Sequence, residues 1–238
     1  MKSFRNWLYI GYGCKNTGVR YRSAIPECNT EAIMLFIFDM DNVLYDYHWR
    51  QRMESLTDIT GIDFHELRRL WWHDEGEWKA EAGIPDTGAE YLRVVNEAFG
   101  SNIAREDWVS LRKEAMVFRP DVIGAVEFAK QHGQVTLLTN NGMLIGEHLT
   151  DVAPHLVPVF GEHMFATAHY GARKPDTLVY ERVLERYRAK GSETFFVDDT
   201  PENLRGAKEL GITTQWFSPH DTGKTIIGAI TEFLDTRS

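Results

Sequence analysis

The sequence is poor in cysteine and in cationic residues. Its only cysteines, Cys14 and Cys28, lie close to the N-terminus, so neither a disulfide framework nor a cysteine-rich zinc site is indicated. The formal net charge is -9 and the isoelectric point is near 5.5, which argues against nucleic acid or an anionic membrane as a partner, because both attract basic surfaces. No apolar run approaches the length of a membrane span. We therefore expect a cytoplasmic protein.

The size and composition fit an ordinary globular protein, except at the N-terminus. The chain has 238 residues, 43% of them hydrophobic, which suffices for one sizeable core or for a core with a small appended domain. Residues 1–33 lack periodicity and carry more basic than acidic side chains. Because Met34 directly precedes the first apolar run, we expect it to be the natural start, and residues 1–33 to be a start-site artefact or a disordered extension.

An apolar run over residues 35–38 ends abruptly on two carboxylates, Asp39 and Asp41. Such a run, without polar alternation, is typical of a strand covered on both faces in a parallel sheet flanked by helices. Strand ends of this kind line the ligand crevice of open α/β sheets. In an extended segment, side chains two residues apart project the same way, so both acids could act on one substrate. The alternative is that they only form a turn or cap a helix.

Polar residues follow three later segments in a similar way. Thr139 and Asn140 follow an apolar strand, Lys174 precedes a helix whose first turn we expect to include Pro175, and a third strand ends on Asp198 and Asp199. Each has a simpler explanation, as a helix cap, a solvated lysine or a strand end. Their joint occurrence, in this order and each close to an apolar strand, favours one shared site.

The four segments together resemble the motifs of the haloacid dehalogenase superfamily in content, order and placement. The resemblance covers residues 34–217, and its most specific parts are residues 173–175 and 196–203. Residues 35–44 and 118–122 are similar to the branch of bacterial sugar phosphatases such as α-D-glucose-1-phosphate phosphatase. One departure is Asn42, because the commoner pattern has glycine after the second aspartate.

The resemblance implies an α/β fold with a Rossmann-like, doubly wound parallel sheet and an inserted all-helical cap of the C1 type. The core is expected to comprise residues 34–45 and 119–238, and the cap residues 46–118, where apolar residues recur at helical spacing. The cap would open and close over the crevice. Three residues just after the first motif are expected to contact substrate, although a surface arginine and a packed tryptophan would be the simpler reading: His48, Trp49 and Arg50.

The same resemblance implies phosphate-ester chemistry. Asp39 would be the nucleophile that forms an aspartyl-phosphate, and Asp41 the general acid and then the general base. Phosphoryl oxygens would be bound by three residues: Thr139, Asn140 and Lys174. Mg²⁺ would offset the repulsion between two anions, because it takes oxygen ligands and keeps several waters. Its expected ligands are the side chains of Asp39 and Asp199 and the backbone carbonyl of Asp41, with Asp198 supporting the site.

We therefore expect a Mg²⁺-dependent phosphatase of a small phosphorylated metabolite, with a sugar phosphate favoured. A haloacid dehalogenase is disfavoured by Asp41, since by resemblance those enzymes lack an acid there. A phosphomutase and a catalytically silent sugar-phosphate binder stay open as alternatives. A signalling receiver domain is disfavoured by the order of the motifs and by the cap-sized insert. The sequence does not predict the oligomeric state.

Overall fold

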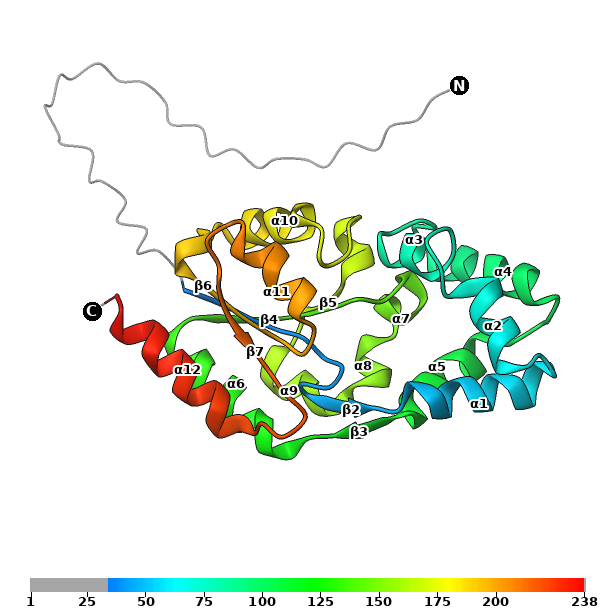
Figure 1. The fold of residues 1–238 in the computed structure, drawn as a ribbon, viewed down its shortest axis with the longest axis horizontal. Helices are drawn as coiled ribbons and strands as arrows, with labels where there is room; N and C mark the ends of the chain where they lie inside the picture. Colours follow the sequence, from blue (N-terminus) through cyan, green and yellow to red (C-terminus); the bar gives the residue numbers. More distant parts are fainter. Residues whose placement is uncertain (1–33, 238) are drawn as a thin grey trace, which may run out of the picture. The chain divides into compact units, whose positions relative to one another are not determined.

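The structure is a computed structural model that describes residues 34–237. A five-stranded parallel sheet forms the middle layer of its core (Figure 1). All four neighbouring pairs of strands are parallel. The chain passes from β1 to one side of the sheet and then to the other, so the strand order reverses at β1, where ligands bind in open α/β sheets. The predicted α/β fold is confirmed. In spatial order the strands are β5 (Met164–Ala166), β4 (Gln134–Thr139), β1 (Leu35–Phe38), β6 (Thr194–Asp198) and β7 (Thr213–Trp216).

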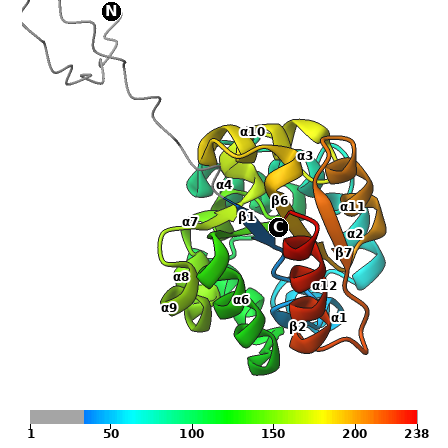
Figure 2. The ribbon, with the colours of Figure 1, turned by 90° about the vertical axis from the view of Figure 1, so that its left-hand side faces the viewer.

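Helices cover both faces of the sheet, which explains why β1 is apolar at every position. All four β1 side chains are fully buried. Phe36 and Phe38 pack in the cluster that contains residues of α6 (Pro120–His132) and α12 (Gly223–Asp235). Leu35 and Ile37 point to the other face, toward residues of α10 (Thr177–Tyr187) and α11 (Pro201–Lys208). Figure 2 shows these two pairs of helices on opposite sides of β1.

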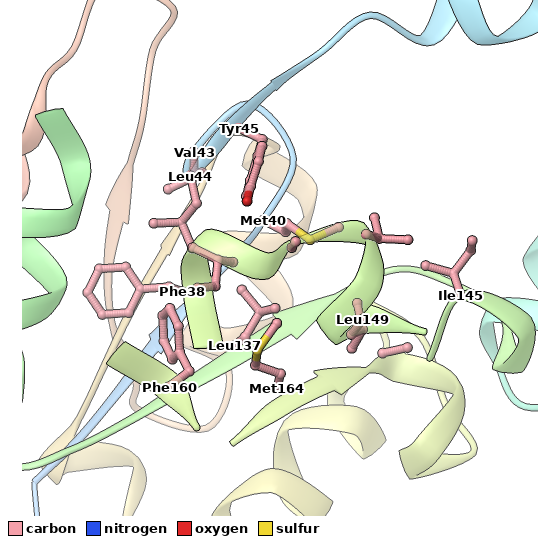
Figure 3. Close-up of a cluster of buried hydrophobic side chains, with 14 of the residues drawn as sticks. Phe38, Met40, Val43, Leu44, Tyr45, Leu137, Ile145, Leu149, Phe160 and Met164 are labelled. Carbon is pink, nitrogen blue, oxygen red and sulfur yellow. The ribbon is translucent and has the colours of Figure 1, made fainter. Parts of the chain in front are cut away.

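The larger hydrophobic cluster extends directly beneath the carboxyl end of β1 (Figure 3). Phe38 contacts Phe160 edge to face, with ring centroids 6.0 Å apart. Met40 is also fully buried, so it anchors the segment between the two candidate acids. Deleting a buried phenylalanine side chain costs about 3–5 kcal/mol. This packing therefore fixes the position of the residues that follow β1.

The remaining core elements are short. Three short α-helices follow β4: α7 (Met143–Glu147), α8 (Leu149–Val152) and α9 (Val157–Phe160). Three turns of 3₁₀ helix complete the connections: η1 (Pro154–Leu156), η2 (Thr167–Tyr170) and η3 (Gly191–Glu193). The helix after Lys174 begins at Thr177. Asp176 caps it, accepting from the backbone of Leu178, so Pro175 lies before the helix and not in its first turn. None of the helices among residues 34–237 combines the length and apolar character needed to cross a membrane.

The insert after β1 is helical in its middle and extended at its two ends. β2 (Tyr45–Tyr47) pairs antiparallel with β3 (Met116–Phe118), and this ribbon joins the insert to the core. Between the two strands the insert is helical, as expected. At its two ends, residues 46–118 are extended and pair with each other, which satisfies their backbone groups. The five helices between the two strands are α1 (Trp49–Thr60), α2 (Phe64–Trp71), α3 (Glu77–Glu81), α4 (Gly88–Phe99) and α5 (Arg105–Glu114).

Buried aromatic side chains hold the insert together. Tyr91 lies edge to face against both Trp71 and Trp108, with ring centroids 5.5 and 5.8 Å apart. The predicted helical spacing of apolar residues thus marks the inner faces of α2, α4 and α5. That the insert moves as a separate domain stays a prediction, as do its boundaries. The expectation for residues 1–33 lies outside the described residues.

Candidate active site

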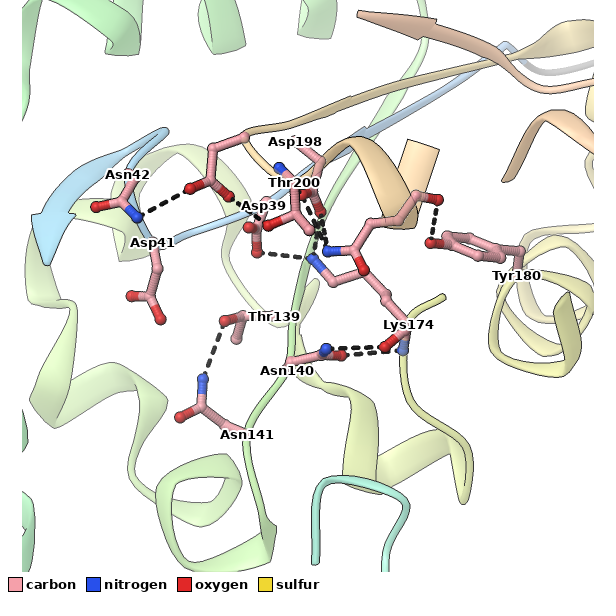
Figure 4. Close-up of polar contacts among 12 residues, drawn as sticks. Asp39, Asp41, Asn42, Thr139, Asn140, Asn141, Lys174, Tyr180, Asp198 and Thr200 are labelled. Atoms are coloured by element: carbon pink, nitrogen blue, oxygen red, sulfur yellow. Dashed lines mark hydrogen bonds and ion pairs between the residues drawn. The ribbon is translucent and has the colours of Figure 1, made fainter. Parts of the chain in front are cut away.

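Candidate catalytic residues meet at the carboxyl ends of three neighbouring strands (Figure 4). β1 lies between β4 and β6, with Phe38 paired to Leu137 on one side and to Val197 on the other. The residues that follow or end these strands therefore converge. They line a cavity of about 250 Å³ together with residues of the insert; from the core it includes Asp39, Asp41, Thr139, Asn140, Lys174 and Asp199.

Lys174 lies at the centre of this cluster, with only 1% of its surface exposed. Its Nζ is 2.8 Å from Asp39 Oδ1 and 2.7 Å from Asp198 Oδ2. Burial alone would lower the pKa of Lys174, but the charges of Asp198 and Asp39 outweigh burial and raise that pKa above its usual value. Lys174 is therefore a fixed positive charge at neutral pH, and not the solvated surface lysine of the simpler reading.

Asp198 is completely buried, and both of its carboxylate oxygens accept hydrogen bonds. Besides Lys174, it accepts from Asn203 Nδ2 at 3.0 and 3.1 Å and from the backbone N–H of Thr200 at 2.8 Å. These donors hold the carboxylate in one orientation, and the carboxylate in turn holds the Lys174 ammonium. Asn203 was not singled out from the sequence; its place in the first turn of the helix after Asp198 was the available signal.

Two amide side chains organise the end of β4. Asn140 Oδ1 accepts from the Lys174 backbone N–H and Asn140 Nδ2 donates to the Lys174 carbonyl, both at 3.0 Å. The Asn140 side chain therefore fixes the Lys174 segment. Asn141, which the sequence did not single out, donates to Thr139 Oγ1 at 2.9 Å. Because Thr139 Oγ1 accepts this bond, its own hydrogen is available to donate toward the cavity.

Three carboxylates form a group that could hold a metal ion. Oxygens of Asp39, Asp198 and Asp199 lie within 4.8 Å of one another. Burial raises the pKa of Asp39 well above its usual value; Lys174 opposes this, and the neighbouring carboxylates add to it. Burial also raises the pKa of Asp199, against a lowering hydrogen bond from Asn42. Buried oxygen ligands whose negative charges repel one another fit a hard divalent cation such as Mg²⁺.

The geometry at Asn42 accounts for asparagine at a position where the commoner pattern has glycine. Its φ is +57°, in the left-handed region that asparagine tolerates better than most residues. Its side chain also does what glycine cannot: Nδ2 donates to Asp199 Oδ2 at 2.9 Å, and Oδ1 accepts from the backbone N–H of Tyr47. Asn42 thereby connects a candidate metal ligand to the ribbon that enters the insert.

Asp41 faces the insert. Arg112, a buried residue of α5, places Nη2 2.5 and 2.7 Å from the two carboxylate oxygens of Asp41. Asp41 is 23% exposed, against 8% for the side chain of Asp39. Both acids line the cavity, as their spacing predicted. An insert residue therefore orients the second acid.

The insert contributes other residues than expected. Of the three predicted contacts, Trp49 lines the cavity, whereas His48 and Arg50 are exposed and lie outside its lining. The buried face of α1 includes Arg52 and Met53, so Arg50 projects away and lies over the ring of Phe64. The insert side of the cavity is instead formed by residues that sequence reasoning missed: Tyr47, Arg52, Trp72, Glu77, Glu81 and Arg112.

Comparison with known proteins places this chain in a family. Residues 33–211 match the sequence model of haloacid dehalogenase-like hydrolases. The sesquiterpene phosphatase astK of Aspergillus oryzae is 45% identical over 182 residues, covering 74% of this chain and 85% of astK. The bifunctional epoxide hydrolase 2 of rat is 25% identical over 52% of this chain, which spans only 24% of that protein; the mouse enzyme matches over the same 24% of its length.

A solved structure has the same fold. A haloacid dehalogenase family enzyme of Bacteroides thetaiotaomicron, crystallised with magnesium and inorganic phosphate, superimposes with a TM-score of 0.64. It is 20% identical and covers 79% of this chain and 96% of its own. At this identity the likeness shows the fold alone. The match over residues 33–211, together with the relative at 45% identity, shows that this chain belongs to the haloacid dehalogenase-like hydrolases.

Proposed function

We propose that this protein is a Mg²⁺-dependent phosphatase that acts through an aspartyl-phosphate on Asp39. The observation that carries the proposal is the setting of Asp39: a buried carboxylate, 2.8 Å from the Lys174 ammonium and grouped with Asp199, in one cavity with Asp41. A nucleophile, a fixed cation, a metal site and a second acid are what phosphoryl transfer through a carboxylate requires.

The chemistry follows from these positions. An Asp39 oxygen attacks phosphorus, the bond to the ester oxygen breaks, and Asp41 gives its proton to the departing alkoxide. Asp41, now a carboxylate, then takes a proton from the water that attacks phosphorus, the bond between phosphorus and the Asp39 oxygen breaks, and phosphate is released. The Asp39 and Asp199 side chains and the Asp41 carbonyl would hold Mg²⁺, which supplies charge to the phosphoryl oxygens.

The remaining polar groups would stabilise charge on the transferring phosphoryl group. Lys174 offers its ammonium and Thr139 its hydroxyl hydrogen, which the bond from Asn141 leaves free. The Asn140 side chain is engaged by Lys174, so we assign the phosphate contact of this residue to its backbone N–H. Asp198 supports the site by holding Lys174. Such preorganised donors supply much of enzymatic rate acceleration.

The alternatives fit these residues less well. A 2-haloacid dehalogenase needs neither a second acid nor a metal, and leaves the pairing of Asp41 with Arg112 without a purpose. A silent binder would need no nucleophile beside a fixed cation. A phosphomutase shares these residues and would differ in how the insert excludes water. Release of phosphate therefore distinguishes a phosphatase from a mutase.

Two leaving groups merit comparison. The sequence favours a sugar phosphate, and the charged, hydrogen-bonding side chains of Arg52, Glu77 and Glu81 in the cavity support it. The 45% identity with a sesquiterpene phosphatase, together with Trp49 and Trp72 in the lining, supports a terpenoid phosphate as the second candidate. We further infer that the insert acts as a lid, because the two strands of one ribbon join it to the core.

The test is phosphate release from p-nitrophenyl phosphate, hexose monophosphates and farnesyl phosphate, with Mg²⁺ or with a chelator. We expect metal-dependent release that Asp39→Asn abolishes while the variant stays folded. Release by Asp39→Asn at the wild-type rate would refute the assignment of the nucleophile. Conversion of a hexose 1-phosphate to the 6-phosphate without release of phosphate would identify a mutase.

A further inference from the structure

Two arginines from different helices of the insert meet at one tyrosine beside the catalytic cluster. Arg52 of α1 donates from Nη1 to Tyr47 Oη at 3.1 Å, and the Arg112 guanidinium of α5 lies 3.8 Å from the centre of the Tyr47 ring. Arg52 is 4% exposed and Arg112 1%. All three residues line the cavity that contains Asp39.

Both guanidinium groups keep unused donors. Nε and Nη2 of Arg52, and Nε and Nη1 of Arg112, are buried without a hydrogen-bond partner among residues 34–237. Within the same residues Arg112 is paired with Asp41, and Arg52 forms no ion pair. Leaving buried donors unpaired costs about 1–3 kcal/mol each, and more for charged groups. Acceptors that arrive with the substrate would remove this cost.

The adjacent acid keeps an unused acceptor. Trp71 Nε1 and Tyr91 Oη both donate to the same oxygen of Glu77, Oε2, at 2.5 Å. This fixes the carboxylate at the cavity and leaves Oε1 to accept from a ligand. The Tyr47 hydroxyl accepts from Arg52, so its own hydrogen is likewise available. The insert therefore presents donors and acceptors side by side.

The charge of the cavity indicates which ligand fits these groups. Its lining contains five carboxyl groups and only three cationic side chains, so a bound Mg²⁺ would leave no positive charge beyond that which the phosphate group takes up. A second anionic group on the substrate would add uncompensated negative charge in a buried site, which is costly. A hydrocarbon would leave the guanidinium donors unpaired. A neutral leaving group with several hydroxyls satisfies donors and acceptors alike.

We propose that Arg52, Arg112, Tyr47 and Glu77 form a subsite that binds neutral hydroxyl groups of the leaving group. This inference rests on the proposed phosphatase function and names the groups that select its substrate. Because Arg112 also contacts Asp41, the candidate acid for the leaving oxygen, the subsite lies on the leaving-group side of the scissile bond. Arg52 is its specificity-determining residue, since it contacts no catalytic group.

The test compares Arg52→Met with a matched control, Arg50→Met. Methionine keeps much of the length of the buried side chain and can still pack on the Trp108 ring, whose centre lies 4.9 Å from the Arg52 guanidinium. Arg50 is on the same helix but is exposed and outside the cavity lining. If Arg52→Met does not fold, Arg52→Lys keeps the charge and loses the fork of donors.

We expect Arg52→Met to lower kcat/KM by about 10- to 100-fold for a hexose monophosphate. The loss on phenyl phosphate, whose leaving group has no hydroxyl and no hydrogen-bond acceptor, should be at least about tenfold smaller, and Arg50→Met should stay within about threefold of wild type on both substrates. Equal losses on the two substrates, or none on either, would overturn the proposal. So would a wild-type preference for farnesyl phosphate, or for a hexose bisphosphate over the monophosphate. No release from p-nitrophenyl phosphate by wild type would instead refute the phosphatase function itself.

Discussion

Replacing Lys174 with methionine should destabilise the protein, because this side chain neutralises two buried carboxylates. Its Nζ lies 2.8 Å from an oxygen of Asp39 and 2.7 Å from an oxygen of Asp198. The side chain of Lys174 is 1% exposed, that of Asp39 8% and that of Asp198 0%. Asp198 keeps its bonds from Asn203 and Thr200, so the loss concentrates on Asp39. Removing one partner of a buried ion pair costs about 3–5 kcal/mol.

The loss should depend on pH in a defined direction. Burial and the neighbouring carboxylates raise the pKa of Asp39, so this group can take up a proton when its cation is removed. Protonated Asp39 no longer needs Lys174, and the destabilisation by Lys174→Met should therefore shrink as pH falls from about 7.5 to about 5.5. Mg²⁺ should shrink it as well, because the cation replaces the missing positive charge.

Thermal unfolding in chelator, followed by circular dichroism, measures this loss of stability. For a protein of this size about 2–4 °C of melting temperature corresponds to 1 kcal/mol, so we expect a decrease of about 6–20 °C. The matched control is Lys79→Met, an exposed lysine that pairs with Glu75 and should change stability by less than about 0.5 kcal/mol. A loss below about 1 kcal/mol for Lys174→Met at pH 7.5 would refute the reasoning.

Three further predictions concern metal, pH and backbone. Because burial raises the pKa values of Asp39 and Asp199, protons compete with Mg²⁺, and thermal-shift titration should show tighter Mg²⁺ binding at pH 7.5 than at pH 5.5; equal affinity would contradict the site. Burial raises the pKa of Glu81, paired with Arg173, from 4.5 to about 7. The folded protein therefore binds this proton more tightly than the unfolded chain does, and stability should fall as pH rises across that range. Glu81→Gln should flatten this part of a melting-temperature profile, and an unchanged slope would exclude Glu81 as its cause. Asn42→Gly keeps the left-handed backbone but loses the bond to Asp199, so it should weaken Mg²⁺ binding with little loss of stability, whereas Asn42→Ala should lose about 1 kcal/mol more; equal stability of the two variants would exclude backbone strain.

The sheet and the core half of the site were predictable because their signals are local. An apolar run such as residues 35–38 can be buried on both faces only in a sheet covered twice, and the carboxyl ends of parallel strands share one edge. Asp39, Thr139 and Asp198 therefore had to meet. Lys174 could be added because its motif is specific to the family.

The insert half of the site was not predictable in the same way. Which of its residues reach the cavity depends on how five helices pack, and this is set by contacts such as that of Tyr91 with Trp108, which are distant in sequence. Proximity to the first motif favoured His48 and Arg50, but the buried face of α1 selected Arg52. A helical-wheel comparison of Arg52 with Met53 and Leu56 was the signal available in the sequence.

The amide residues illustrate a second limit. Asn141 and Asn203 do not react or bind metal in the proposed mechanism; they orient Thr139 and Asp198. Residues that orient others have no characteristic spacing, because any nearby backbone position can deliver a hydrogen bond. They become identifiable only when the three-dimensional contacts are known.

The most direct test of the central claim is to trap the covalent intermediate. Wild-type protein is quenched during turnover of a phosphate ester with Mg²⁺, the acyl phosphate is reduced with borohydride, and the peptides are sequenced by mass spectrometry. Reduction of a phosphorylated aspartate yields homoserine, and we predict homoserine at position 39 only when substrate and Mg²⁺ are both present. Homoserine at position 41 or 199, or at neither of these nor position 39 while phosphate is released, would contradict the assignment of Asp39 as the nucleophile.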